Sequence, residues 1–135
     1  MIEKFVARWE ENKGALEQKF RDKVPGSYLD VVRGVIETIN GGDDYGEPNS
    51  KVIHVIDDGD YQGTILFIIP ESGYQPSTYW VVSVHYGSCS VCDTLQSITD
   101  CYDYTGNYDD RKLTDQAIKD LMTLALHIVQ RIKEI

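Results

Sequence analysis

Cysteine and histidine side chains gather between residues 85 and 101 of the sequence. Cys89 and Cys92 form a C-x-x-C pair that follows an expected strand and opens an expected short helix, with His85 before them and Cys101 after them. Unpaired N–H groups and the helix dipole favour a thiolate at such a position. Cys and His together are also the ligands of tetrahedral zinc sites. We therefore expect a zinc or thiol site at His85, Cys89, Cys92 and Cys101, or cysteines that pack as small apolar side chains.

Each of two kinds of thiol chemistry requires further features elsewhere in the chain. Dithiol redox exchange needs a thioredoxin-like β-α-β context, which the order of elements does not show. A nucleophilic Cys89 needs a base, for which His54 and His85 are candidates. It also needs oxyanion donors, which no feature of the sequence identifies. The pattern favours a protein that is not an enzyme and binds no cofactor, with zinc as the alternative.

Carboxylates are concentrated in the middle of the chain. The formal net charge is −9 for 135 residues. The segment 34–110 contains thirteen Asp and Glu and one cation, Lys51, giving −12, whereas the two flanking segments together carry +3. A concentrated negative field repels nucleic-acid phosphates and attracts cations or basic proteins. The charge distribution therefore predicts a basic protein partner, excludes direct nucleic-acid binding, and leaves no sign of a membrane partner.

Three clusters supply the residues that we expect to contact this partner. Two are acidic turns at residues 43–47 and 57–60, which could alternatively bind Ca²⁺ or serve only as polar turns. The third, 100–110, combines aspartates with tyrosines, which are enriched at binding hot spots. Its alternative is a solvated loop. The expected partner-binding residues are Asp43, Asp44, Glu47, Asp57, Asp58, Asp60, Asp100, Tyr102, Asp103, Tyr104, Tyr108, Asp109 and Asp110.

The spacing of apolar residues predicts the helices and strands that must position these side chains. Apolar residues at helical spacing predict helices up to Phe20, from Tyr28 to Ile39, and from Thr114 to about Glu134, with Ser27 and Thr114 as N-caps. Runs rich in β-branched and aromatic residues predict strands over 51–57, 61–69 and 78–86, and a short helix ends near residue 98.

These elements predict one α+β domain spanning residues 1–135, of order ααβββαα. It contains a three-stranded antiparallel meander flanked by an N-terminal helical pair and a long C-terminal helix. In the third strand, Trp80, Val82, Val84 and Tyr86 form the better core face. The opposite face is mixed, so we expect it to be exposed or covered by a partner. A small ligand such as a nucleotide could bind there, with the candidate residues His54, Thr64, Tyr79, Ser83 and His85.

The sequence also predicts the cellular compartment of the protein. The first residues show no export signal, and no apolar run is long enough to span a membrane. Three cysteines are an odd number at low density, which argues against a disulfide framework. We therefore expect a cytoplasmic protein.

Several sequence runs resemble a family of small proteins encoded by bacteriophages and prophages. The most distinctive run is Tyr86-Gly87-Ser88-Cys89-Ser90-Val91-Cys92-Asp93, and the runs 54–64 and 74–77 are similar too. The resemblance implies an accessory protein that acts inside an infected bacterium. Combined with the acidic middle segment, it suggests an anti-defence, anti-CRISPR-like protein that inhibits a basic host or defence protein, most plausibly one that binds nucleic acid.

Overall fold

The computed structural model describes residues 2–42, 44–57, 63–73, 75–86, 94–99, 102–103 and 112–135. Helix α1 (Ile2–Asp22) and helix α2 (Tyr28–Ile39) precede strands β1 (His54–Asp57), β2 (Gly63–Pro70) and β3 (Tyr79–Tyr86). The short helix α3 (Thr94–Thr99) and the strand pair β4 (Tyr102–Asp103) and β5 (Lys112–Leu113) follow. Helix α4 (Asp115–Arg131) and strand β6 (Lys133–Glu134) complete the α+β fold.

The first three strands form the expected antiparallel meander, in a sheet of order β1-β2-β3-β6. Strands β1 and β2 pair from His54 opposite Ile68 to Asp57 opposite Ile65. Strands β2 and β3 pair along their whole length, from Gly63 opposite Tyr86 to Pro70 opposite Tyr79. This register fixes which side chains share each face of the sheet.

The sheet has a fourth strand that the periodicity did not predict. Helix α4 ends at Arg131, about three residues before the expected end, and Ile132 turns into extended conformation. Lys133 and Glu134 then pair with Val81 and Trp80 of β3. An open strand edge leaves unpaired N–H and C=O groups, and this pairing satisfies part of that edge.

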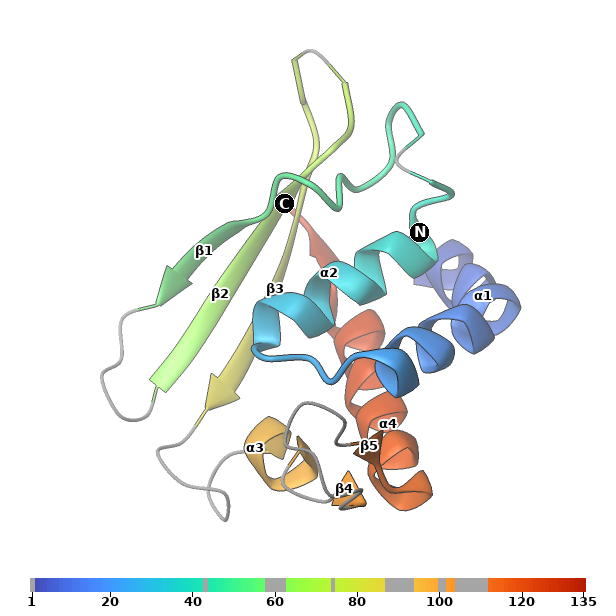
Figure 1. The fold of residues 1–135 in the computed structure, drawn as a ribbon. Helices are drawn as coiled ribbons and strands as arrows, with labels where there is room; N and C mark the ends of the chain where they lie inside the picture. The colour runs from blue at the N-terminus through green and yellow to red at the C-terminus, as the bar shows by residue number, and fades with distance from the viewer. Residues whose placement is uncertain are drawn as a thin grey trace.

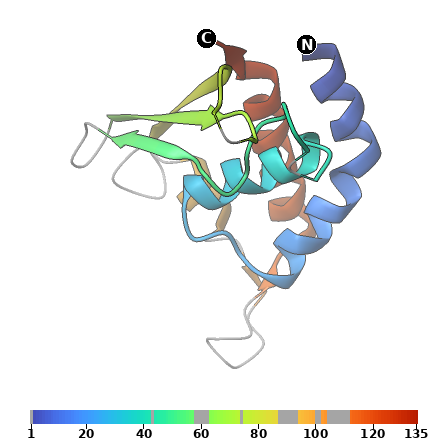
Figure 2. The same ribbon diagram turned by 90° about the horizontal axis from the view of Figure 1, so that it is seen from above.

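The helices pack on one side of the sheet (Figures 1 and 2). Trp80, Val82 and Val84 of β3 point into the core between sheet and helices, as predicted, and are at most 6 % exposed. The N-caps are also confirmed, because Ser27 Oγ accepts from Asp30 N and Thr114 Oγ1 accepts from Ala117 N. No helix in the described part of the chain is long and apolar enough to cross a membrane.

Candidate partner-binding loop

The expected zinc or thiol site is only partly within the described residues. His85 is exposed at the end of β3, and its Nδ1 lies 2.8 Å from Thr64 Oγ1 on β2. Cys89, Cys92 and Cys101 lie outside the described residues, so the site stays a prediction. Within the described ranges, no three His, Cys, Asp or Glu side chains gather as a metal site would require.

Most of the expected partner-binding residues also lie outside the described part. For Tyr102 and Asp103 the structure describes the backbone, in strand β4, and not the side chains. The described side chains are those of Asp44, Glu47 and Asp57. Those that lie outside are Asp43, Asp58, Asp60, Asp100, Tyr104, Tyr108, Asp109 and Asp110.

Asp57 marks the end of the sheet from which the β1–β2 connection leaves. It is the last residue of β1, it is exposed, and its Oδ1 accepts a 2.7 Å hydrogen bond from the Tyr86 hydroxyl. Tyr86 is the last residue of β3 and pairs with Gly63, the first of β2. The last residues of β1 and β3 and the first residue of β2 therefore lie at the same end of the sheet.

Residues 40–50, the first part of the connection between α2 and β1, form a loop that is held in place by backbone hydrogen bonds on one side. Gly46 N donates to Ser72 O, and Ser72 N donates to Glu47 O. Asn49 N donates to Pro70 O, which connects the loop to the end of β2. Within the loop, Asn40 Nδ2 donates to Pro48 O. These hydrogen bonds fix the backbone of the loop against the end of the sheet.

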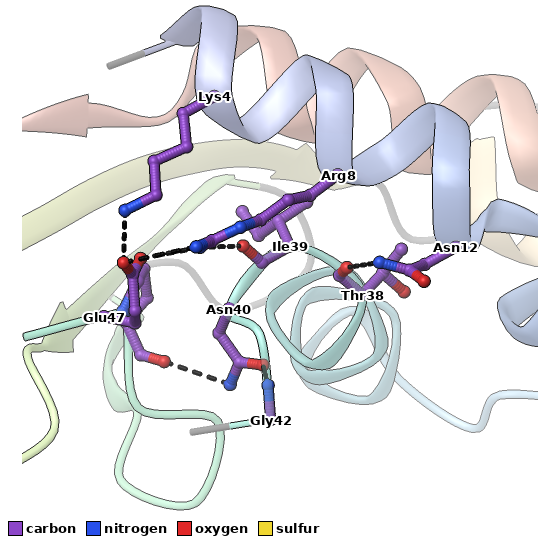
Figure 3. Close-up of polar contacts among 9 residues, drawn as sticks. Lys4, Arg8, Asn12, Thr38, Ile39, Asn40, Gly42 and Glu47 are labelled. Carbon is purple, nitrogen blue, oxygen red and sulfur yellow. Dashed lines mark hydrogen bonds and ion pairs between the residues drawn. The ribbon is translucent and has the colours of Figure 1, made fainter. Parts of the chain in front are cut away.

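The other side of the loop is held by two cations of α1. Figure 3 shows Lys4 and Arg8 reaching Glu47 from the helix. Arg8 Nη1 lies 2.8 Å from Glu47 Oε2 and also donates to Ile39 O, at the end of α2, at 3.0 Å. Desolvation raises the pKa of Glu47, but the hydrogen bonds and charges of Arg8 and Lys4 outweigh it and hold the pKa below its usual value. Glu47 is thus engaged inside the molecule, and we assign it a bracing role.

The braced loop presents one aromatic side chain to solvent. Tyr45 is 87 % exposed, the largest value among the exposed large hydrophobic residues. Its ring lies beside Gly73, where an added Cβ would come within 2.9 Å of Tyr45 Cε2. Asp44 next to it is exposed, and no described Lys or Arg forms an ion pair with it. The 100–110 tract, which we expect to contact a partner, has the same combination of tyrosine beside aspartate.

Sequence reasoning missed Tyr45, although a signal was present. The run Asp43-Asp44-Tyr45-Gly46-Glu47 repeats the tyrosine–aspartate chemistry of the later tract in a shorter form. The exposure of the ring depends on Gly73 and Ser72, which are nearly thirty residues away in the chain. Local sequence therefore gave the chemistry of the loop but not its orientation.

The register also places the five candidate ligand-binding residues of the sheet. His54, Thr64, Tyr79, Ser83 and His85 share the face that points away from the helices. They do not converge: Thr64 contacts His85, whereas His54 lies opposite Ile68, about 13 Å further along β2. The sheet thus forms an extended surface over which these polar residues are dispersed.

Fold and loop together define an α+β protein with an open sheet face and a braced acidic loop. No family model matches the chain, and no curated protein or solved structure gives a match. The resemblance to a phage-encoded family therefore stays a prediction.

Proposed function

We propose that this is a binding protein, not an enzyme, which attaches to a basic surface of another protein inside a phage-infected bacterium and blocks it. The observation that carries the proposal is the braced loop at residues 40–50, which holds Tyr45 at 87 % exposure beside Asp44. Binding to a fixed loop does not require ordering it, so less free energy is lost on association.

The chemistry of the loop fits a partner rich in Lys and Arg. A tyrosine ring offers a large contact area with few rotatable bonds, and its face attracts a guanidinium or ammonium group. Asp44 adds a carboxylate that can accept from the same cation. A groove built for nucleic acid presents such cations in rows.

The charge distribution supports the same partner. The cations of α1 neutralise two carboxylates of the 34–110 segment, Glu37 through Lys19 at 2.8 Å and Glu47 through Lys4 and Arg8. The segment contains thirteen carboxylates and one cation, and this excess of negative charge is what we expect to act on a partner. Such a field raises the association rate with a basic surface.

The test is a pull-down from the bacterial host, followed by affinity measurement with the purified captured protein. We expect a basic protein, and we expect Tyr45→Ala to weaken its binding by about tenfold or more, as at a typical hot spot. Asp44→Asn should weaken binding less, and Glu11→Gln, an equal charge change on the exposed face of α1, should leave it unchanged. Equal affinity of the wild type and Tyr45→Ala would refute the loop as the contact site.

A further inference from the structure

A hollow of about 380 Å³ opens on the surface between α1 and α2, next to the connection that joins them. Figures 1 and 2 show the two helices side by side, with this connection at the end of α1. The apolar part of the lining is formed by Leu16, Phe20, Val24 and Pro25. Sites for small molecules have volumes of roughly 300–1,000 Å³ and combine an apolar lining with a few polar groups. The hollow therefore has the size of a small-ligand site.

The floor of the hollow is formed before any ligand arrives. Leu16 and Phe20 are at most 4 % exposed and belong to the hydrophobic core. Gly34 of α2 lies directly against them, because an added Cβ would come within 2.8 Å of Leu16 Cδ1 and 3.9 Å of Phe20 Cε1. α2 thus places no side chain over the hollow at this position, and the packing of the core fixes its shape.

Arg33 is the polar group that distinguishes the hollow. It is half-buried, and its Nε donates to Ser50 O at 3.1 Å, which fixes the position of the guanidinium. The other two half-buried arginines of the described chain, Arg8 and Arg21, each form an ion pair with a carboxylate. No carboxylate of the described residues forms an ion pair with Arg33. Its two Nη groups can therefore donate to a ligand in the hollow.

A second cation of the lining is also open to a ligand. Lys23 is exposed, and none of the described carboxylates forms an ion pair with it. The third cation, Lys19, already pairs with Glu37 at 2.8 Å. Arg33 and Lys23 are thus the two groups that favour an anion.

Two carboxylates limit the charge that such an anion can carry. Asp22 and Asp30 also line the hollow, where they accept from Gln18 Nε2 and Gly26 N. The lining as a whole contains three cations and three carboxylates, so it is neutral in a chain of net charge −9. A single negative charge can be met by the two available cations. A phosphate group, with a charge near −2, would in addition be repelled by the two aspartates.

We propose that the hollow binds a small monocarboxylate with an apolar body, such as an aromatic acid. A planar guanidinium matches a carboxylate through two parallel hydrogen bonds, and Arg33 has both Nη groups available for them. Lys23 adds the second positive charge, and the apolar body of the ligand covers Val24 and Pro25. This inference does not depend on the proposed function, because the hollow and the loop with Tyr45 are separate surfaces.

Three probes with one ring system and different charges test the proposal. They are 1-naphthoate, its neutral amide and 1-naphthylmethylammonium. We expect the intact protein to bind the carboxylate about tenfold more tightly than either of the others. In an NMR titration, amide shifts should change at residues 16–25 and 30–37 and not at residues 44–47. Equal or tighter binding of the cation or the amide, shifts confined to other residues, or no saturable binding of 1-naphthoate would overturn the proposal.

Substitutions of the two cations separate the hollow from the rest of the surface. Arg33→Gln should weaken binding of 1-naphthoate by about tenfold or more, since a hydrogen-bonded charge pair is lost. Because this variant also loses the contact with Ser50 O, the second variant is Lys23→Gln at an exposed position, which should weaken binding by about threefold. The matched control is Lys119→Gln on α4, which is equally exposed and should bind as wild type. Wild-type affinity of both the Arg33 and the Lys23 variants would rule out the assigned anion site.

Discussion

Glu47 is the residue on which the loop conformation most depends. Its carboxylate accepts from Arg8 and Lys4, and its carbonyl accepts from Ser72 N. Charge-assisted hydrogen bonds to a half-buried carboxylate contribute more than neutral ones. We therefore expect Glu47→Gln to lower the free energy of unfolding by about 1–2 kcal/mol, measured by urea denaturation, while Glu11→Gln changes it little.

The same carboxylate predicts a pH dependence. Because the folded-state pKa of Glu47 is lowered from 4.5, the stabilisation is present above pH 4.5 and is lost as the pH falls through the lower folded-state pKa. The difference in unfolding free energy between wild type and Glu47→Gln should therefore be largest near neutral pH and become smaller in acid. A difference that grows in acid would contradict this assignment.

Gly73 lies against the ring of Tyr45. Its φ of 141° is a conformation that other residues rarely adopt, and a Cβ there would meet the tyrosine ring. Gly73→Ala should cost about 1–3 kcal/mol of stability and weaken partner binding as the ring moves. The matched control is Gly14→Ala in α1, where nothing lies within 4 Å of an added Cβ. That substitution should stabilise the protein, because alanine favours the helix. Thermal unfolding of both variants tests whether Gly73→Ala lowers the stability and Gly14→Ala raises it.

At the scale of elements, the caps were predictable and the end of α4 was not. Ser27 and Thr114 are residues whose side chains bond local backbone N–H groups, so a few neighbouring residues determine them. Ile132, Lys133 and Glu134 continue a helical pattern equally well, and they become a strand because β3 has an edge to pair. The unpaired edge of β3 exists only once the sheet has formed, so the local sequence does not reveal it.

The cap of α4 gives a quantitative test at this scale. Thr114→Ala removes the acceptor for Ala117 N and should lower the free energy of unfolding by about 1 kcal/mol. Thr123→Ala, the same substitution on the exposed side of α4, should change it little, because Thr123 Oγ1 donates only to Lys119 O. Chemical denaturation of the two variants compares a cap with an ordinary helix position.

The candidate site shows the same limit of sequence reasoning. Clustered carboxylates identified the 43–47 turn, but not that Glu47 is held by α1 whereas Asp44 is exposed. Arg8 and Lys4 lie about forty positions before Glu47, and the sequence gives no sign that they meet. The exposed Tyr45 was missed for the same reason, since its neighbour Gly73 lies nearly thirty positions later in the chain.

At the scale of the molecule, the excess of carboxylates predicts how association responds to salt. The chain carries −9, with −12 in segment 34–110. Screening at high ionic strength should slow association with the basic partner much more than it speeds dissociation. Stopped-flow or surface-binding kinetics at low and high salt test this. An association rate that is independent of salt would contradict electrostatic steering.

The contact between Arg8 and Glu47 has a consequence for how such a protein can change through evolution. One guanidinium holds both the last carbonyl of α2 and the carboxylate of the loop, so a lineage that lost Glu47 would leave Arg8 without its carboxylate, and one that lost Arg8 would leave Glu47 to Lys4 alone. Substitutions at positions 8 and 47 should therefore appear together in descendants of this sequence, whereas position 45, the contact residue that we propose, should vary independently of them.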